Sequence, residues 1–381
     1  MGSVAMLLYI RSASGTFAEA GLVSGAVLLG LAVGSVGQGK LIDRFGATRT
    51  LGVVVVVFVL VATVVFASVE LGAPLAVLLP VGLAFGATQP AISPASRGLW
   101  TQLVPAGRLR DAAFTYEAIS IEVFFILGPA IAGFLSTSEW PGLGLLVAVI
   151  LFVFGTLFFI AAPAVRRWHV DPDARGRGAS LTAVIRLPGV QTLMLLVFGL
   201  GIVIGFAEVG IPAAAAAAGE PQLSGLLLGI WSLTSVVFGV WYASRPWPRP
   251  LHIRAPVLLA GFAVLVGVMA IPSELVGLTI TMLVSGLLIT PQSTLHSLLV
   301  ERVAPAQSSG EAFGWVITAV TVGLAIGQAV SGQIVQAVGS SSAFAAAVLP
   351  GLVLAAVVWW RRGTLEVAFP GGRGHDGVQE Q

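Results

Sequence analysis

Three glutamates stand inside apolar stretches of this sequence, where an ionisable side chain is costly and indicates a functional site. Glu117 and Glu122 lie within residues 112–135, and Glu208 lies in "GFAEVGIP" within residues 190–212. A carboxylate held away from water keeps its proton to higher pH than an exposed one, so it can bind and release protons near neutrality. We therefore predict proton coupling at these acids. The alternative for each is a hydrogen bond between helices or a wet helix end.

Glu117 and Glu122 are five positions apart, which places them about 140° apart around a helix. They do not share a helix face, so a site of paired carboxylates is not expected there. No Lys or Arg stands near mid-segment to neutralise Glu122. Its carboxyl would then be protonated part of the time or bound to a cationic ligand.

Gln89, Gln292 and His296 form a second group of polar candidates. Gln89 precedes Pro90, and Gln292 follows Pro291. Proline has no backbone N–H, so it leaves a carbonyl in its helix without a partner, and a ligand could use that carbonyl. His296 could titrate near neutral pH. It lies toward one end of its apolar segment, where contact with water alone is the alternative.

The elements that carry these residues are predicted to be membrane spans. The chain has 381 residues, of which 57% are hydrophobic and 9% charged, whereas a soluble domain carries about 25% charged residues. Apolar runs of the length needed to cross a bilayer indicate an all-α polytopic membrane protein. Eleven such runs cover residues 17–37, 51–69, 75–96, 112–135, 143–162, 190–212, 222–244, 255–272, 275–299, 311–337 and 340–360.

A twelfth apolar stretch, "MGSVAMLLYI", has only ten residues before Arg11. As a helix it would reach about 15 Å, half a bilayer. We therefore expect a truncated first helix, which gives eleven full spans plus a short stub.

Basic and acidic residues alternate between successive loops. With the stub counted as the first span, even-numbered connections carry the basic residues, and only Arg11 departs from this pattern. The alternate loops hold Glu70, Glu139, Glu220 and Glu274 without Lys or Arg. The excess of basic residues in cytoplasmic loops predicts a multi-pass protein of the cell membrane with both termini in the cytoplasm.

The longest loop, residues 163–189, is rich in arginine and follows the sixth span, so we interpret it as a linker between two halves, 1–162 and 190–360. Residues 361–381 are predicted to be a disordered tail. The halves share a pattern: Pro90–Phe114 resembles Pro291–Phe313, and a matched glycine follows each phenylalanine fourteen positions later. Parallel repeats of six spans characterise one large class of secondary transporters.

The loop "GKLIDRFGATR", residues 39–49, joins the second and third spans on the arginine side. It resembles the signature loop of the major facilitator superfamily, Gly-x-Leu-x-Asp-Arg-x-Gly-x-x-Arg. The matching residues are Gly39, Leu41, Asp43, Arg44, Gly46 and Arg49. The second basic residue that the family usually has beside the last arginine is absent.

The resemblance implies the family's fold, two six-helix bundles in parallel pseudo-repeat, over nearly the whole chain. It also implies that Gly39, Asp43, Arg44, Gly46 and Arg49 form a gating loop, which latches the halves when the outside is open. Ordinary anchoring by basic residues is the alternative. In this fold spans one, four, seven and ten line the central cavity, so Gln89, Gln292 and His296 are candidate substrate contacts.

The segment "GPAIAG", residues 128–133, resembles the end of a motif found in export-type members of the family. Ala132 replaces one glycine of that motif, and Phe124 stands where an upstream glycine is expected. Gly128, Pro129 and Gly133 would let the fifth span bend and pack closely against a partner. The segment therefore favours efflux weakly, and a simple packing kink explains it equally well.

The chain has no cysteine and no G-x-x-x-x-G-K-[ST] loop, and its four histidines are scattered. We expect no enzyme activity, no cofactor and no metal site. The prediction is a transporter that works by alternating access and exports a small amphipathic molecule in exchange for protons. It would be a monomer in the lipid bilayer and would not bind nucleic acid. Import of a small polar nutrient is the alternative. A membrane sensor that transports nothing is a third hypothesis, which the gating loop disfavours.

Overall fold

The computed structural model describes residues 2–104, 138–167, 184–243, 249–304 and 309–366, together with 109, 116, 124, 127–129 and 131–136. Within these residues, nine helices are long and apolar enough to cross a membrane. Eight of these are single helices: α2 (Phe17–Phe45), α3 (Ala47–Glu70), α7 (Leu143–Ala161), α9 (Pro188–Ala217), α10 (Ser224–Ala243), α11 (Leu251–Val268), α14 (Ser309–Val338) and α15 (Ser340–Trp360). The ninth, Leu275–Val303, is an interrupted span. They confirm the predicted spans in those parts of the chain, while most of the predicted span 112–135 lies outside the described residues.

Two predicted spans are each built from two helices rather than one. Residues 75–103 form α4 (Leu75–Thr88) and α5 (Ile92–Leu103), and residues 275–303 form α12 (Leu275–Gly286) and α13 (Ile289–Val303). In the first pair the interruption falls at Pro90, which cannot donate a helix hydrogen bond. These interruptions were not predicted as separate helices.

The first helix, α1 (Gly2–Ser14), has 13 residues, which corresponds to about 20 Å. It runs through Arg11 and is longer than the predicted ten-residue stretch, yet it is still shorter than a bilayer core of about 30 Å. Tyr9 ties it to α3, because the Tyr9 hydroxyl donates to Oε1 of Glu70 at 2.6 Å. Trp140 Nε1 donates to the same oxygen at 2.7 Å.

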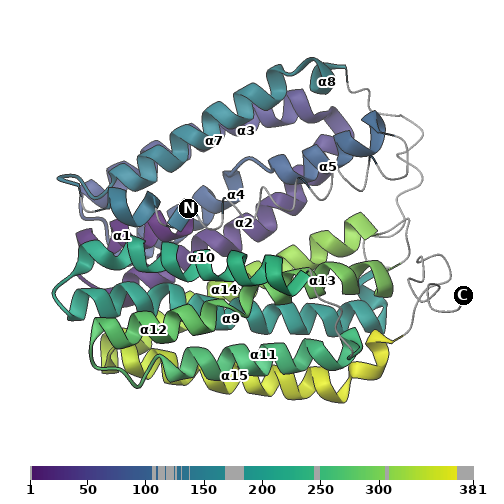
Figure 1. The fold of residues 1–381 in the computed structure, drawn as a ribbon. Helices are drawn as coiled ribbons and strands as arrows, with labels where there is room; N and C mark the ends of the chain where they lie inside the picture. Colours follow the sequence, from purple (N-terminus) through teal and green to yellow (C-terminus); the bar gives the residue numbers. More distant parts are fainter. Residues whose placement is uncertain are drawn as a thin grey trace, which may run out of the picture.

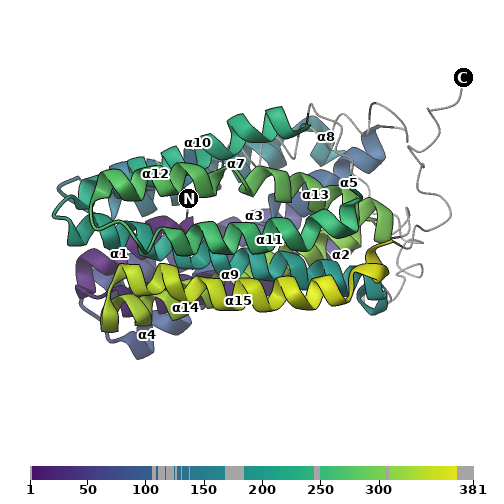
Figure 2. The ribbon, with the colours of Figure 1, turned by 60° about the horizontal axis from the view of Figure 1, so that its bottom comes forward.

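The helices form two groups, α1–α8 and α9–α15, which lie side by side along most of their length (Figure 1). We name the two ends of the bundle by their described charges. The arginine-rich end carries Arg44, Arg49, Arg166, Arg302 and Arg361, and the acidic end carries Glu70, Glu139, Glu220 and Glu274. Helix α8 (Pro163–Arg166) and the C-terminal end of α15 lie at the same end of the bundle (Figure 2). Toward that arginine-rich end, α3, α5 and α7 splay away from α9 and α13 (Figure 1).

Glycines bring the backbones of α14 and α9 into contact. A Cβ atom added at Gly201 would lie 2.2 Å from the Val320 carbonyl oxygen, and one added at Gly327 would lie 2.3 Å from the Ile202 carbonyl oxygen. Neither position can hold a larger residue without separating the helices. Small residues at helix crossings are the usual means of close packing in membranes.

Glycines also join the two groups across α2 and α14. A Cβ atom at Gly21 would lie 2.5 Å from the Gln328 carbonyl oxygen, and one at Gly332 would lie 2.4 Å from the Phe17 carbonyl oxygen. Phe17 N donates to Gln336 Oε1 at 3.3 Å at the same crossing. These residues belong to the first half of α2 and the last half of α14, so this crossing lies toward the acidic end.

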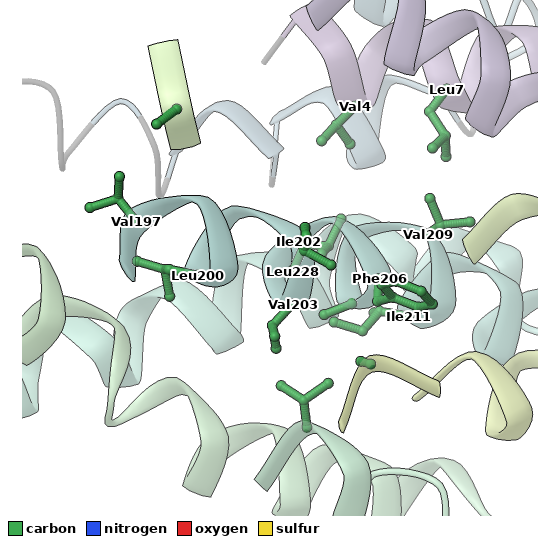
Figure 3. Packing of buried hydrophobic residues seen from close by; sticks show 14 of the residues in the cluster. Val4, Leu7, Val197, Leu200, Ile202, Val203, Phe206, Val209, Ile211 and Leu228 are labelled. Carbon is green, nitrogen blue, oxygen red and sulfur yellow. The ribbon is translucent and has the colours of Figure 1, made fainter. Parts of the chain in front are cut away.

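One apolar core runs through both groups of helices. In Figure 3, Val4 and Leu7 of α1 lie over the part of α9 that carries Ile202, Phe206 and Val209. Helix α9 is the most enclosed span, since 78% of its most apolar window is buried. Side chains on α9 are therefore shielded on nearly all sides by other helices.

Candidate proton and substrate site

Glu208 is the predicted acid that the structure describes, and it lies on the enclosed helix α9. Its side chain is 6% exposed. The Oε2 atom of Glu208 accepts a hydrogen bond of 2.6 Å from Nε2 of Gln328 on α14. Within the described residues, Glu208 has no ion pair with a basic side chain. A buried carboxyl with only an amide partner is costly to ionise, because one hydrogen bond offsets just part of the desolvation of the charged form.

The hydrogen bonds continue from Gln328 to the other group of helices. Ser24 on α2 donates its hydroxyl to Gln328 Oε1 at 2.7 Å, and both side chains are fully buried. The amide of Gln328 therefore bridges the carboxyl of Glu208 and the hydroxyl of Ser24. We call these three residues the Glu208 relay. It crosses the contact between α2 and α14, so opening that contact must break it or change its partners.

Gln292 and His296 lie one turn apart on α13, and both are buried. The amide Nε2 of Gln292 donates to the Leu288 carbonyl oxygen at 3.1 Å. The Oε1 atom of Gln292 and the Nε2 atom of His296 are buried and have no hydrogen-bond partner. Buried polar atoms are rarely left unpaired, so these two mark a place where a ligand or water can bind.

Gln89 ends α4 and is also buried. Its carbonyl and that of Ala87 are not open to a ligand, because Gln38 Nε2 on α2 donates to both, at 2.8 Å and 3.0 Å. The carbonyl that Pro90 would leave without its helical donor is that of Gly86, and it accepts from the Gln89 N–H at 3.2 Å. The described part of this break therefore leaves none of these three carbonyls free for substrate. The side-chain amide of Gln89 lies near the beginning of α1, where a Cβ atom added at Gly2 would be 3.5 Å away.

The predicted gating loop forms the junction of α2 and α3 at the arginine-rich end. Gly46 has φ 85°, which favours glycine, and its N–H donates to the Ile42 carbonyl oxygen. Arg44 and Arg49 are exposed, and Arg44 lies over the ring of Phe45 at 5.1 Å. Among the described residues neither arginine forms an ion pair. Gly39 has open space beside its Cα atom, and the side chain of Asp43 lies outside the described part.

The predicted packing motif is described at three positions. Gly128, Pro129 and Gly133 are buried. A Cβ atom added at Gly133 would lie 2.0 Å from the Cα atom of Gly225 at the beginning of α10. This is a second backbone contact between the two groups of helices, also at the acidic end. Glu117 and Glu122, on the same predicted span, lie outside the described residues.

The structure shows three polar residues at these contacts that sequence analysis did not select. Gln328 stands in "GQAVSG", a segment chosen for its matched glycine. Ser24 and Gln38 are uncharged polar residues within an apolar span, and both are almost fully buried. An amide inside a span is a signal that could have been used, because it must find a partner in a medium without water.

The fold and these contacts define a class. Two groups of spanning helices, joined at one end and splayed at the other, with a buried carboxyl near their contact, form an all-α polytopic membrane protein built from two bundles. The family model described as Major Facilitator Superfamily matches residues 1–302. This chain belongs to the major facilitator superfamily.

Solved structures of similar fold share little sequence with this chain. The nucleoside transporter NupG is 16% identical, with 94% of this chain and 97% of that chain covered and a TM-score of 0.65. The xylose transporter XylE from E. coli, in an inward open conformation, is 16% identical, with 94% and 92% covered and a TM-score of 0.64. A bacterial homolog of the human lysosomal transporter Spinster, inward-facing and unoccupied, is 13% identical, with 97% and 95% covered and a TM-score of 0.72. A search of curated protein sequences found no match.

Proposed function

We propose that this protein is a proton-coupled transporter that exports a small amphipathic molecule by alternating access, with Glu208 as its proton site. The observation that carries the proposal is the Glu208 relay, in which a buried carboxyl is bonded to the contact between the two halves. Burial without a basic side chain as partner among the described residues favours the proton-bound carboxyl. Separation of α2 from α14 would expose the same carboxyl to water and release the proton.

The arrangement of the two halves supports a conformation that is open to the cytoplasm. Basic residues mark the cytoplasmic side of a membrane protein, so the splayed, arginine-rich end would face the cytoplasm. The structure then represents a state open to the inside. The gating loop would be released in this state, in keeping with the exposure of Arg44 and Arg49.

The apolar character of the enclosed spans supports an amphipathic substrate. Residues 197–211 of α9 are buried apart from the partly buried Phe198 and Ile204, and all of them except Glu208 are apolar or glycine. A ligand that binds beside such a helix gains most of its affinity from apolar area. Export rather than import is favoured by the resemblance of residues 128–133 to an export motif.

Import of a small polar nutrient is the second candidate. The observation that favours it is the pair of unpaired polar atoms on Gln292 and His296, which suits a ligand with several hydrogen-bonding groups. The solved structures of similar fold include transporters named for nucleosides and xylose. Their identity of 16% supports the fold and leaves the substrate of this chain open.

The sign of proton movement tests both candidates. Purified protein is reconstituted in vesicles with a pH dye inside, and tetraphenylphosphonium, uridine or xylose is added outside at equal pH. Tetraphenylphosphonium has no titratable proton, but it crosses bilayers unaided and its charge can drive protons outward, so the pH change is compared with that in protein-free vesicles. Solute entry that makes the lumen alkaline indicates exchange for protons, which we expect for the cation. Acidification with uridine or xylose would indicate symport and import.

Two variants connect the pH change to the proposed site. Glu208→Gln should abolish the proton movement while labelled solute still equilibrates. Glu274→Gln removes an exposed carboxyl at the beginning of α12 and should behave like the unaltered protein. Solute entry without any pH change in the unaltered protein would make it a facilitator. No solute entry with any compound in the series would contradict the transport proposal and favour a sensor.

A further inference from the structure

The interruption between α4 and α5 contains an amide that comes from another helix. In a continuous α-helix the N–H of residue 91 would donate to the carbonyl of residue 87. Here the N–H of Ala91 donates to Oε1 of Gln38 at 2.9 Å, and Nε2 of Gln38 donates to the Ala87 carbonyl oxygen at 3.0 Å. The side-chain amide of Gln38 is thus inserted into one hydrogen bond of the helix ladder.

A third bond completes the arrangement. Nε2 of Gln38 also donates to the Gln89 carbonyl oxygen at 2.8 Å. The whole amide group is therefore used, and the Gln38 side chain is 5% exposed. Insertion of a side chain into the i to i−4 ladder is one of the few causes of a sharp kink in a helix. Pro90 interrupts the helix, and Gln38 supplies the partners that the interruption requires.

Helices α2 and α4 are in backbone contact up to this point. A Cβ atom at Gly30 would lie 2.0 Å from the Leu83 carbonyl oxygen, and one at Gly34 would lie 2.2 Å from the Ala87 carbonyl oxygen. Helix α4 must therefore move together with α2. Beyond the break, α5 is a separate helix that can change its angle to α4. On α2, Gln38 is followed directly by Gly39, the first residue of the predicted gating loop.

The second half of the chain has a related arrangement. Ser235 on α10 accepts a hydrogen bond of 2.9 Å from the N–H of Thr290, close to the interruption between α12 and α13. The hydroxyls of Ser235 and Thr290 lie 2.6 Å apart. In both halves, a polar side chain on the second helix supplies a hydrogen bond to the backbone where the fourth helix is interrupted. Because the same kind of hydrogen bond occurs in both halves, we infer that it helps to position the interrupted helix.

We propose that Gln38 is a positioning residue that sets the angle between α4 and α5, and through it the place of Gln89 at the centre of the bundle. The angle is then controlled by α2, the helix that ends in the gating loop. Because Gln38 bonds backbone atoms only, its effect should not depend on which solute is transported. The inference therefore stands apart from the proposed function.

The absence of native cysteines allows two spin labels to report the angle directly. Val77→Cys on α4 and Leu103→Cys on α5 place the labels at exposed positions on the two arms. We expect one narrow distance distribution in otherwise unaltered protein and a shifted or broadened one with Gln38→Leu. The amide of Ala91 should then exchange with deuterium about tenfold faster, because its acceptor is gone. Ser35→Ala, one turn away with a bond only to Ala32, should change neither measurement.

Gln38→Glu separates a specific role from a general loss of packing. A protonated glutamic acid keeps the acceptor for the Ala91 N–H and one donor for either the Ala87 or the Gln89 carbonyl, so it replaces the amide in part. The ionised form has no donor for either carbonyl. The narrow distance distribution should therefore return at acidic pH and be lost at alkaline pH in a single sample. If Gln38→Leu does not fold, this variant still decides the point. An unchanged distribution in Gln38→Glu at both pH values, or in a folded Gln38→Leu, would overturn the proposal.

Discussion

Gln328 and Glu208 are 120 positions apart in the sequence, yet Nε2 of the first lies 2.6 Å from Oε2 of the second. The bond lies where α14 passes between α9 and α2, and Ser24 extends it to the other half of the molecule. A single amide thus joins the proposed proton site to the contact that must open during transport. The following predictions test this connection and the surfaces around it.

Replacing Gln328 by leucine should weaken the closed contact at the acidic end. The change leaves the buried carboxyl of Glu208 without its partner, which costs about 1–3 kcal/mol. Ala18 and Gln333 are neighbours there, since Gln333 Nε2 donates to the Ala18 carbonyl oxygen at 3.4 Å. The disulfide yield of an Ala18→Cys, Gln333→Cys pair therefore measures closure, and it should fall at least severalfold. An undiminished yield would show that the bond does not hold the contact.

Replacing Ser24 by alanine should have a smaller effect of the same kind. One hydrogen bond of about 0.5–1.5 kcal/mol is lost, and the bond from Gln328 to Glu208 remains. The disulfide yield of the same cysteine pair should fall less than with Gln328→Leu. Thr63→Ala is the control, because Thr63 bonds only to Val59 within its own helix.

Adding a single methyl group at Gly133 should hold the acidic end open. The new Cβ atom would meet the Cα atom of Gly225 at 2.0 Å, so the backbones of the two halves must separate. Alanine favours a helix over glycine by up to about 1 kcal/mol, so a loss of closure cannot come from helix propensity. Gly155→Ala on α7, where nothing lies within 4 Å, is the matched control. Equal disulfide yields in the two variants would refute the close contact.

Replacing His296 by leucine should raise stability and lower transport. The buried Nε2 of His296 has no partner, so an apolar side chain of similar size removes a desolvation cost of about 1–3 kcal/mol. Thermal unfolding of the purified protein should shift upward, while solute entry into vesicles should slow about tenfold if the atom binds ligand. Ser297→Ala, at the next position, is the control. A lower unfolding temperature would mean that His296 is a packing residue.

The positions of the spans could be predicted from sequence because they depend on local properties, whereas some boundaries could not, since α2 continues to Phe45 beyond the predicted end at residue 37. Run length and loop charge locate α2, α3, α7, α9 and α11, and the glycine-rich loop locates the junction at Gly46. The break at Gln89 could be placed only approximately, since Pro90 marks it but does not say which side chain fills it. Gln38 fills it from a different helix, and no local pattern carries that information.

The residues of the candidate site also fall into those that could be predicted from sequence and those that could not. Glu208 could be selected because a charge in an apolar run is conspicuous, whereas its partner Gln328 could not. An uncharged amide in a span has several possible partners, and only the crossing of α9, α14 and α2 decides among them. Arg44 and Arg49 were predicted to gate by family resemblance, and both are exposed in this structure.

The glycine crossings between α2 and α14 have a consequence for the rate of the proposed conformational cycle. At Gly21 and Gly332 the halves meet with bare peptide backbone instead of interlocked side chains. Surfaces of this kind can separate without changes of side-chain rotamer, so little side-chain conformational entropy is lost when they close. The energy barrier then resides mainly in a few polar bonds such as that of Ser24. Turnover can be tuned by single hydroxyl or amide groups while the apolar framework stays unchanged.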